Sequence, residues 1–147
     1  MLTIGDAAPA WSGKDQDDAD RSSADFAGRW LLFYFYPKDD TPGCTLEACG
    51  FRDSYAGLAK RIAIVGVSAD SAESHRAFIA KFQLPFTLIA DTDRSVIKAF
   101  GADGLFFPKR VTFIIDPQNV IRKIYHGFDA KDHAVVVGKD IDILLAS

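Results

Sequence analysis

The sequence predicts an α/β fold in which a mixed β-sheet is flanked by helices on both faces. Three observations support this prediction. Short, strongly apolar runs that suit buried strands recur along the chain. Segments with helical spacing of apolar residues separate several of these runs. The last two runs flank a four-residue turn typical of an antiparallel hairpin, and a further helical segment follows them. Strands that alternate with helices and end in a hairpin indicate a mixed sheet between helices.

The first half of the chain contains two apolar runs. The polar stretch 13–25 is rich in Asp and Ser, and it predicts a surface loop or hairpin. Residues 30–36 are almost continuously aromatic or aliphatic and stop at Pro37, which is typical of a buried central strand. Residues 62–68 form a second strand of the same kind.

A helix is predicted after the second strand. Asp70 and Glu73 have the spacing of a capping box, and the segment ends at 84–85, Leu-Pro. One helical face of this segment carries His75, Phe78, Ile79 and Phe82. Residues 86–90 then form the third strand.

The remaining elements are a short helix, a hairpin and a final helix. Residues 96–100 have helical spacing and are followed by a glycine that ends the helix. Residues 111–115 and 120–125 form the predicted hairpin. Apolar spacing in 134–145 predicts the final helix, although Gly138 weakens it. This layout is compatible with a thioredoxin-like fold.

Composition excludes several classes of protein. The length of 147 residues fits one domain, 1–147, with a sizeable core. The net charge of −3 gives no electrostatic reason to expect nucleic acid or an anionic membrane as a partner. No run approaches the roughly 18 apolar residues of a membrane span, and the start of the chain lacks the features of a signal peptide. We therefore expect a cytoplasmic protein.

Both cysteines, Cys44 and Cys49, lie in segment 37–53, PKDDTPGCTLEACGFRD. They could be core cysteines, part of a metal site, a structural disulfide or a redox pair. A permanent disulfide is disfavoured in the cytoplasm. Zinc would need two more ligands, and the three histidines have no ligand-like spacing, so we expect no metal. The absence of C-x-x-C disfavours a thioredoxin-type oxidoreductase. An inert core cysteine and a redox pair remain open.

Local sequence places Cys44 in the first turn of a helix. Thr41 is a favourable N-cap, and Pro42 suits the first helical position. Free backbone N–H groups and the helix dipole would favour a thiolate at Cys44. Three neighbouring carboxylates, Asp39, Asp40 and Glu47, would oppose it if their charges faced the sulfur. A cation must therefore approach the sulfur from elsewhere in the chain, and the candidates are Lys38, Arg52 and Arg110.

The spacing of the two cysteines excludes a disulfide on an intact helix. Residues five apart are rotated by about 140° and separated by about 7.5 Å along the axis, which places their Cα atoms about 8.6 Å apart. A disulfide needs less than about 7 Å. Gly43 and Gly50 bracket the pair and lower the resistance to unwinding. A bond between Cys44 and Cys49 therefore requires the first turns to unwind.

Segment 33–53 resembles the active-site segment of the peroxiredoxins of the bacterioferritin comigratory protein (PrxQ) group. The general pattern P-x-x-x-T-x-x-C occurs as Pro37, Thr41 and Cys44, and a second cysteine five residues on marks one branch of the group. The similarity covers nearly the whole chain, extending to 66–70, 74–75, 86–91 and 110–116. The sequence departs from the group in the short link 101–110 and in the turn 116–119, which lacks a glycine.

The resemblance implies a thioredoxin-like fold and a thiol-dependent peroxidase that reduces hydrogen peroxide and alkyl hydroperoxides without a cofactor. Cys44 would be the peroxidatic cysteine, which becomes a sulfenic acid. The Thr41 hydroxyl and the backbone N–H of Cys44 would bind the peroxide. Arg110 would bind it too and stabilise the thiolate and the transition state. Pro37 would shield the sulfur from water.

The same resemblance makes Cys49 the resolving cysteine. It would form an intramolecular Cys44–Cys49 disulfide, which thioredoxin or a similar dithiol would reduce. No second subunit would be needed, so we expect a monomer.

Several residues keep two interpretations. Glu47 orients a guanidinium such as that of Arg110, or is solvated. Arg52 pairs near Asp53 or with the site. His75 fits a packed histidine better than a catalyst.

Two other functions compete with the peroxidase. One is a redox sensor or chaperone that uses Cys44 without turnover. The other, a catalytically inactive binding module, is disfavoured because the whole cysteine motif is present.

Overall fold

The structure is a computed structural model, and it describes residues 2–126 and 132–146. Within these residues one mixed sheet has the strand order β2-β1-β5-β4-β3-β6-β7. Its strands are β1 Ser12–Asp15, β2 Asp20–Ser22, β3 Leu31–Phe35, β4 Ala63–Ser68, β5 Thr87–Ala90, β6 Val111–Ile115 and β7 Ile121–Tyr125. The helices are a 3₁₀ turn at Ser23–Phe26 and α1 Pro42–Asp53, α2 Tyr55–Leu58, α3 Ala72–Phe82, α4 Ser95–Ala99 and α5 His133–Ala146.

Strand β3 forms the centre of the sheet. It pairs in parallel with β4 and antiparallel with β6, and all five of its residues are buried. Its side chains alternate between two cores, because successive residues of a strand point to opposite faces. Leu32 and Tyr34 belong to one core, whereas Leu31, Phe33 and Phe35 belong to the other.

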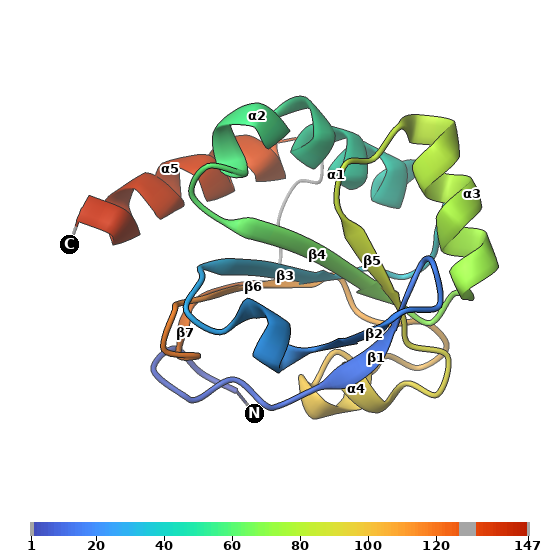
Figure 1. Cartoon of the computed structure of the whole chain (residues 1–147), viewed down its shortest axis with the longest axis horizontal. Coiled ribbons are helices and arrows are strands. Elements are labelled where there is room, and N and C mark those ends of the chain that lie inside the picture. The colour runs from blue at the N-terminus through green and yellow to red at the C-terminus, as the bar shows by residue number, and fades with distance from the viewer. Residues whose placement is uncertain (1, 127–131, 147) are drawn as a thin grey trace.

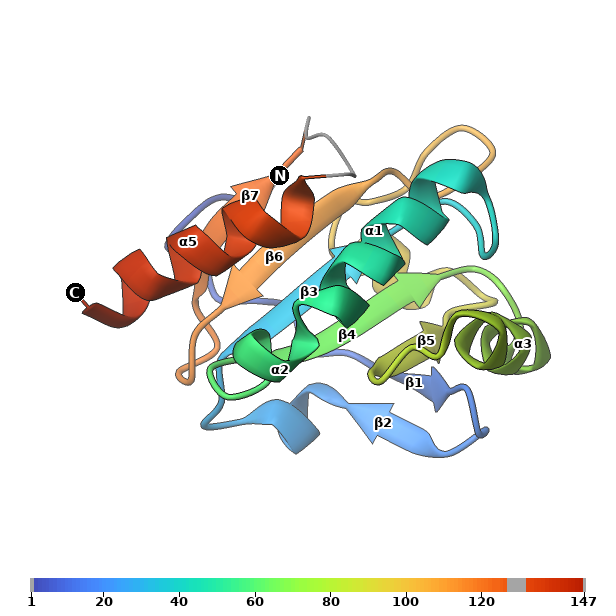
Figure 2. The same cartoon turned by 90° about the horizontal axis from the view of Figure 1, so that it is seen from above.

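Helices cover both faces of the sheet, as Figure 1 shows. Helices α1, α2, α3 and α5 lie on one side, and α4 lies on the other. The view from above shows α1 and α5 crossing the sheet next to each other (Figure 2). The predicted mixed sheet with helices on both faces is therefore confirmed.

The close packing of the sheet against α1 depends on Gly66 in β4. A Cβ atom at this position would lie 2.8 Å from both the Tyr34 ring and a Leu88 methyl group. Real Cβ atoms do not approach other atoms so closely, so a side chain here would displace the Tyr34 ring that packs on Phe51 of α1.

Most predicted elements are present with shifted ends. The polar stretch 13–25 contains the β1–β2 hairpin, and the final helix forms despite Gly138. The capping prediction for α3 was wrong by one residue, because Ser71 is the N-cap and its side chain accepts from the Ser74 N–H. Strand β1 also pairs with β5, so the hairpin extends the main sheet. Within the described ranges, no helix has the length and apolarity that crossing a membrane requires.

Candidate active site

The candidate site is built from two distant parts of the chain, which meet where β3 ends and β6 begins. The chain leaves β3 after Phe35 and passes through the loop 36–41 into α1, which carries Cys44. Because β6 runs antiparallel to β3, its first residue Val111 pairs with Phe35. Arg110 immediately precedes Val111, so the topology brings it to Cys44 from 66 positions away in the sequence.

The Cys44 thiol is buried and contacts a guanidinium. Cys44 is 1% exposed, and Arg110 Nη2 lies 3.1 Å from its Sγ. The first helical hydrogen bond of α1 runs from Thr45 N–H to the Thr41 carbonyl. The amides of Gly43 and Cys44 come earlier in the helix and have no intrahelical acceptor. Guanidinium and backbone donors thus converge near the sulfur.

Gly43 leaves room for the guanidinium. A Cβ atom on Gly43 would lie 3.1 Å from Arg110 Nη2, tighter than an ordinary contact. The glycine before Cys44 therefore lets Arg110 pass over the first turn of α1.

Glu47 lies on α1 one turn after Cys44 and binds the same arginine. Arg110 Nη1 donates to Glu47 Oε1 at 2.7 Å, and Glu47 is 1% exposed. Of its two interpretations, contact with Arg110 is confirmed and solvation is wrong. Burial raises the pKa of Glu47 to about 7, even though Arg110 acts in the opposite direction. Arg110 therefore bridges Cys44 and a buried carboxyl group.

His133 of α5 lies on the far side of Glu47. Its Nε2 is 2.9 Å from Thr112 Oγ1 and 3.9 Å from Glu47 Oε2. Burial, followed by the charge of Arg110, lowers the pKa of His133 to about 4. The imidazole is thus neutral near pH 7, and the Glu47–His133 contact is not an ion pair there. Among the described residues, Glu47 Oε2 has no hydrogen-bond partner.

Thr41 is the N-cap of α1 by its backbone, but its side chain does not cap the helix. Its hydroxyl instead donates to the Lys38 carbonyl at 3.0 Å. The predicted N-cap position of Thr41, with Pro42 at the start of the helix, is therefore confirmed, although the Thr41 side chain makes no capping bond. Because the hydroxyl proton is used, the Thr41 oxygen is left as an acceptor, which suits a ligand carrying an O–H group. Pro37 is half-buried in the same loop.

Cys49 lies on the same continuous helix as Cys44. Both cysteines are free thiols, and Cys49 is partly exposed. This agrees with the expectation that the reduced protein holds both residues on one helix.

The structure distinguishes the three residues that the sequence offered as the cation beside Cys44. Arg110 reaches Cys44, Arg52 pairs with Asp53 and donates to the Phe82 carbonyl, and Lys38 is exposed.

The sequence interpretation missed a buried polar network beside the site. The sequence left open whether Asp39 faces the sulfur, and its carboxylate instead accepts from Tyr36, Ser74 and His75. The prediction of a packed His75 is confirmed, since this residue is 0% exposed. One potential metal-ligand atom from each of Asp39, Asp70 and His75 lies within 4.8 Å of the other two, a spacing that could hold a metal ion. Each of these side chains, however, already forms a hydrogen bond to a protein group. The signal that could have revealed the network is a charged residue next to a buried strand.

Comparisons with known proteins identify a family, related sequences and similar structures. Residues 4–124 match the AhpC/TSA family. The chain is 42% identical to chloroplastic peroxiredoxin Q of Sedum lineare over 137 residues, which cover 90% of this chain and 74% of the relative. It is 39% identical to the putative peroxiredoxin bcp of Coxiella burnetii over 148 residues, covering 94% and 98% of the two chains. The crystal structure of a cysteine-to-serine mutant of PrxQ from Xylella fastidiosa superposes with a TM-score of 0.94 at 28% identity, covering 99% of this chain and 98% of that one.

Proposed function

Since the chain belongs to the AhpC/TSA family and is a peroxiredoxin of the peroxiredoxin Q/bcp group, we propose that Cys44 is its peroxidatic cysteine and Cys49 its resolving cysteine. Family membership supports thiol-dependent peroxidase activity, with a peroxide as substrate and a thiol as reductant. The observation that carries the assignment to Cys44 is the Arg110 guanidinium 3.1 Å from its buried sulfur.

The first step transfers an oxygen atom to Cys44. The thiolate attacks one peroxide oxygen, the O–O bond breaks, and the other oxygen leaves as water or alcohol after taking up a proton. The sulfur is oxidised to a sulfenic acid while the peroxide is reduced. Negative charge builds on the leaving oxygen, and positioned donors lower the barrier by stabilising it.

Three groups support binding of the peroxide next to the sulfur. The Cys44 N–H and Arg110 Nη2 are donors for the peroxide oxygens. The Thr41 oxygen accepts the proton of the hydroperoxide, because its own hydroxyl hydrogen is bound to the Lys38 carbonyl. Glu47 holds the other arm of the guanidinium, which restricts its rotation. Pro37 borders the same loop and limits access of water.

The second step forms the Cys44–Cys49 disulfide and releases water. Cys49 loses its thiol proton and attacks the Cys44 sulfur, and the sulfenic acid oxygen leaves. Because both residues lie on α1, the helix must unwind first. Thioredoxin or a similar dithiol then reduces the disulfide by exchange. Since both cysteines lie on one chain, a monomer in the cytoplasm can complete the cycle.

Alkyl hydroperoxides are proposed as substrates alongside hydrogen peroxide. Two apolar side chains near the site in sequence are each 54% exposed, namely Leu46 of α1 and Phe107. Leu46 lies two residues after Cys44, and Phe107 lies three residues before Arg110. Both could contact an alkyl chain.

A turnover assay tests the proposal. Peroxide consumption is followed by NADPH oxidation with thioredoxin and thioredoxin reductase, using hydrogen peroxide and a bulky alkyl hydroperoxide in turn. Many equivalents should be consumed per chain, and Cys44→Ser should consume none. A protein that stops after one equivalent, although the reductant can reduce its disulfide, would instead be the redox sensor.

A further inference from the structure

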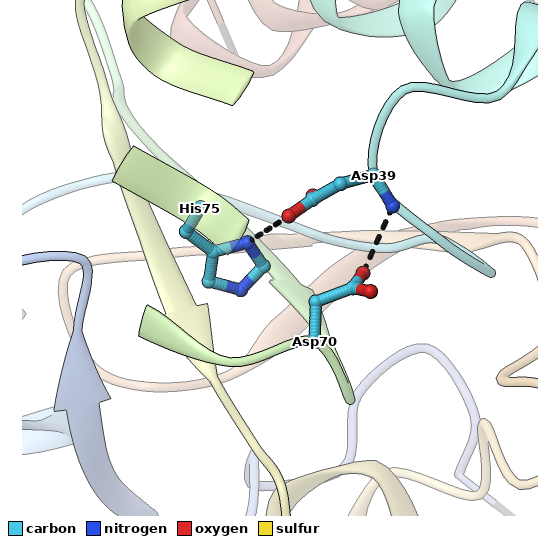
Figure 3. A group of neighbouring side chains, drawn as sticks. All are labelled: Asp39, Asp70 and His75. Atoms are coloured by element: carbon cyan, nitrogen blue, oxygen red, sulfur yellow. Dashed lines mark hydrogen bonds and ion pairs between the residues drawn. The ribbon is translucent and has the colours of Figure 1, made fainter. Parts of the chain in front are cut away.

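The network around Asp39 holds the loop that leads into the active-site helix. Figure 3 shows His75 pointing toward Asp39, whose backbone nitrogen faces Asp70. Asp39 is buried although both of its neighbours, Lys38 and Asp40, are exposed. The loop is therefore fixed to the protein interior at Asp39.

Both the backbone and the side chain of Asp39 are bound. The Asp39 N–H donates to Asp70 Oδ2 at 2.9 Å, and Ser68 donates to the same oxygen at 2.6 Å. Its carboxylate Oδ1 accepts from Tyr36 at 2.6 Å, and Oδ2 accepts from Ser74 at 2.8 Å. His75 Nδ1 completes the set at 2.7 Å from Oδ2.

The hydrogen bonds of His75 fix the number of protons in this contact. Its Nε2 lies 2.9 Å from the Ile89 carbonyl, which can only accept, so Nε2 carries a hydrogen. The 2.7 Å contact between Nδ1 and Asp39 Oδ2 needs a second proton, because otherwise two lone pairs would face each other. His75 and Asp39 therefore share one proton. The other titratable groups that face the pair are Tyr36 and Asp70.

The groups that hold Asp39 lie outside α1. They come from Tyr36 just after β3, from Asp70 just after β4, from α3 and, through Ile89, from β5. Asp39 lies two residues before Thr41 and five before Cys44. Lys38, whose carbonyl orients the Thr41 hydroxyl, is the residue immediately before Asp39. Fixing Asp39 thus fixes the start of α1 without tying down the turns that must unwind.

We propose that His75 is a positioning residue for Cys44. His75 shares a proton with Asp39, and this contact holds the loop that carries Thr41, together with the first turn of α1, in the reactive arrangement. This inference rests on the proposed peroxidase function of Cys44. It assigns no contact with substrate to His75, which is fully buried.

Two substitutions at His75 separate positioning from folding. The side-chain nitrogen of Asn lies as many bonds from Cβ as Nδ1 of histidine does, so His75→Asn can still donate to Asp39. The nitrogen of Gln matches Nε2 in the same way, so His75→Gln can donate to Ile89 but leaves Asp39 without this donor. Each variant loses one buried hydrogen bond, and we expect similar falls in melting temperature.

The rate of Cys44 oxidation by hydrogen peroxide in a single turnover should distinguish the two variants. We expect His75→Gln to be slower than wild type by roughly 10- to 100-fold, because loss of alignment weakens catalysis strongly. His75→Asn should remain within about threefold of wild type, since the contact with Asp39 is kept.

Control variants identify effects of stability alone. Glu73→Gln changes an exposed residue on the same helix, and Ile97→Val weakens the core on the opposite face of the sheet. Equal rates for His75→Asn and His75→Gln, or an equal slowing in Ile97→Val at the same loss of melting temperature, would overturn the inference.

Hydrogen exchange gives a second readout that needs no peroxide. The amides of Asp39, Asp40 and Thr41 should exchange faster in His75→Gln than in His75→Asn, and equal exchange in the two variants would contradict the anchoring role. A wild-type protein whose Cys44 does not react with peroxide would refute the proposed function. The exchange comparison would still decide whether His75 anchors the loop.

Discussion

Cys44 and Cys49 share a helix but have different surroundings. Cys44 is buried against Arg110 in the first turn, whereas Cys49 is partly exposed further along α1. Arg110 donates a hydrogen bond to the Cys44 sulfur. The two thiols should therefore have separate tasks.

Substitution of each cysteine tests this division. Cys44→Ser should abolish peroxide reduction, because the nucleophile is gone. Cys49→Ser should consume about one equivalent per chain and then stop as a sulfenic acid that is open to further oxidation. Mass spectrometry with a sulfenic-acid probe checks both outcomes. Sulfenic acid in Cys44→Ser, with none in Cys49→Ser, would reverse the assignment.

Glu47 should give the stability of the protein a measurable pH dependence. Its pKa rises from an ordinary 4.5 to about 7 in the folded protein, so the folded state binds the proton more tightly than the unfolded state. The free energy of unfolding should then fall as pH rises from about 4.5 to 7, by roughly 3 kcal/mol in total from this group. Denaturant unfolding of wild type and Glu47→Gln across this range measures the difference.

The comparison with Glu47→Gln is needed because His133 acts in the opposite direction. Its lowered pKa of about 4 makes its contribution to stability rise with pH, over the interval up to its ordinary 6.5. That contribution cancels when the two proteins are subtracted. A difference that stays constant with pH would show that Glu47 remains ionised throughout.

The sequence could predict candidate site residues but only part of what they contact. Cys44, Thr41 and Arg110 belong to a recognisable pattern, and the structure brings Arg110 to Cys44. The bond from Thr41 to Lys38 and the burial of Asp39 depend on loop geometry set by tertiary contacts, which residue preferences do not encode. Glu47 kept two interpretations because its burial results from packing under Arg110 and α5.

At the scale of elements, α1 has to satisfy two requirements. As a helix it aligns Cys44 with Arg110, and the proposed mechanism requires it to unwind so that the disulfide can form. Oxidation should therefore deprotect the amides from Thr45 to Gly50 against hydrogen exchange, while Leu31–Phe35 stays protected. Mass spectrometry of both redox forms measures this. Unchanged protection around Cys49, in protein shown by mass to carry the disulfide, would exclude unwinding.

Two glycines in regular elements should respond oppositely to alanine. Gly138 in α5 has room for a methyl group, whose nearest neighbour would be a Leu58 methyl at 3.8 Å. Gly138→Ala should thus stabilise the fold by about 0.5–1 kcal/mol, because glycine is a poor helix former. Gly66→Ala should destabilise it by about 1–3 kcal/mol through the clash with Tyr34 and Leu88. Denaturant unfolding checks both, and a destabilised Gly138→Ala would contradict the reasoning.

The elements themselves were largely predictable, because apolar periodicity records which faces are buried. Residues 30–36 read as a central strand, and β3 indeed has strands on both sides. Helix α2 was missed because Tyr55–Leu58 is a single turn, too short for periodicity to appear. The start of α3 was displaced by one residue, because Asp70 and Ser71 are both acceptable caps.

At the scale of the whole molecule, the disulfide should fail to stabilise the protein. Closing a loop of six residues gains about 2 kcal/mol by reducing the entropy of the unfolded chain. Unwinding one or two turns of α1 loses several hydrogen bonds of about 1 kcal/mol each, together with the contacts of Arg110.

The reduced protein should therefore be at least as stable as the oxidised protein. Guanidinium unfolding of the two forms measures this, with a Cys44→Ser/Cys49→Ser variant as the control that cannot change redox state. An oxidised form more stable by the full loop-closure value would show that α1 loses little on oxidation.

The strand order could not be read from the sequence. The pairing of β3 with β6 and of β1 with β5 joins segments that are far apart in the chain, whereas periodicity reports only local geometry. The resemblance to a known family supplied the fold at this scale, and the structural comparison agrees with it.

The antiparallel pairing of β3 with β6 also bears on how the protein is made. A ribosome completes Cys44 long before it reaches Arg110, and the guanidinium meets the sulfur only after β6 has joined the sheet. A nascent chain that ends before β6 therefore carries Cys44 without its contact to Arg110. We expect such a chain to react with peroxide at Cys44 more slowly than the complete fold.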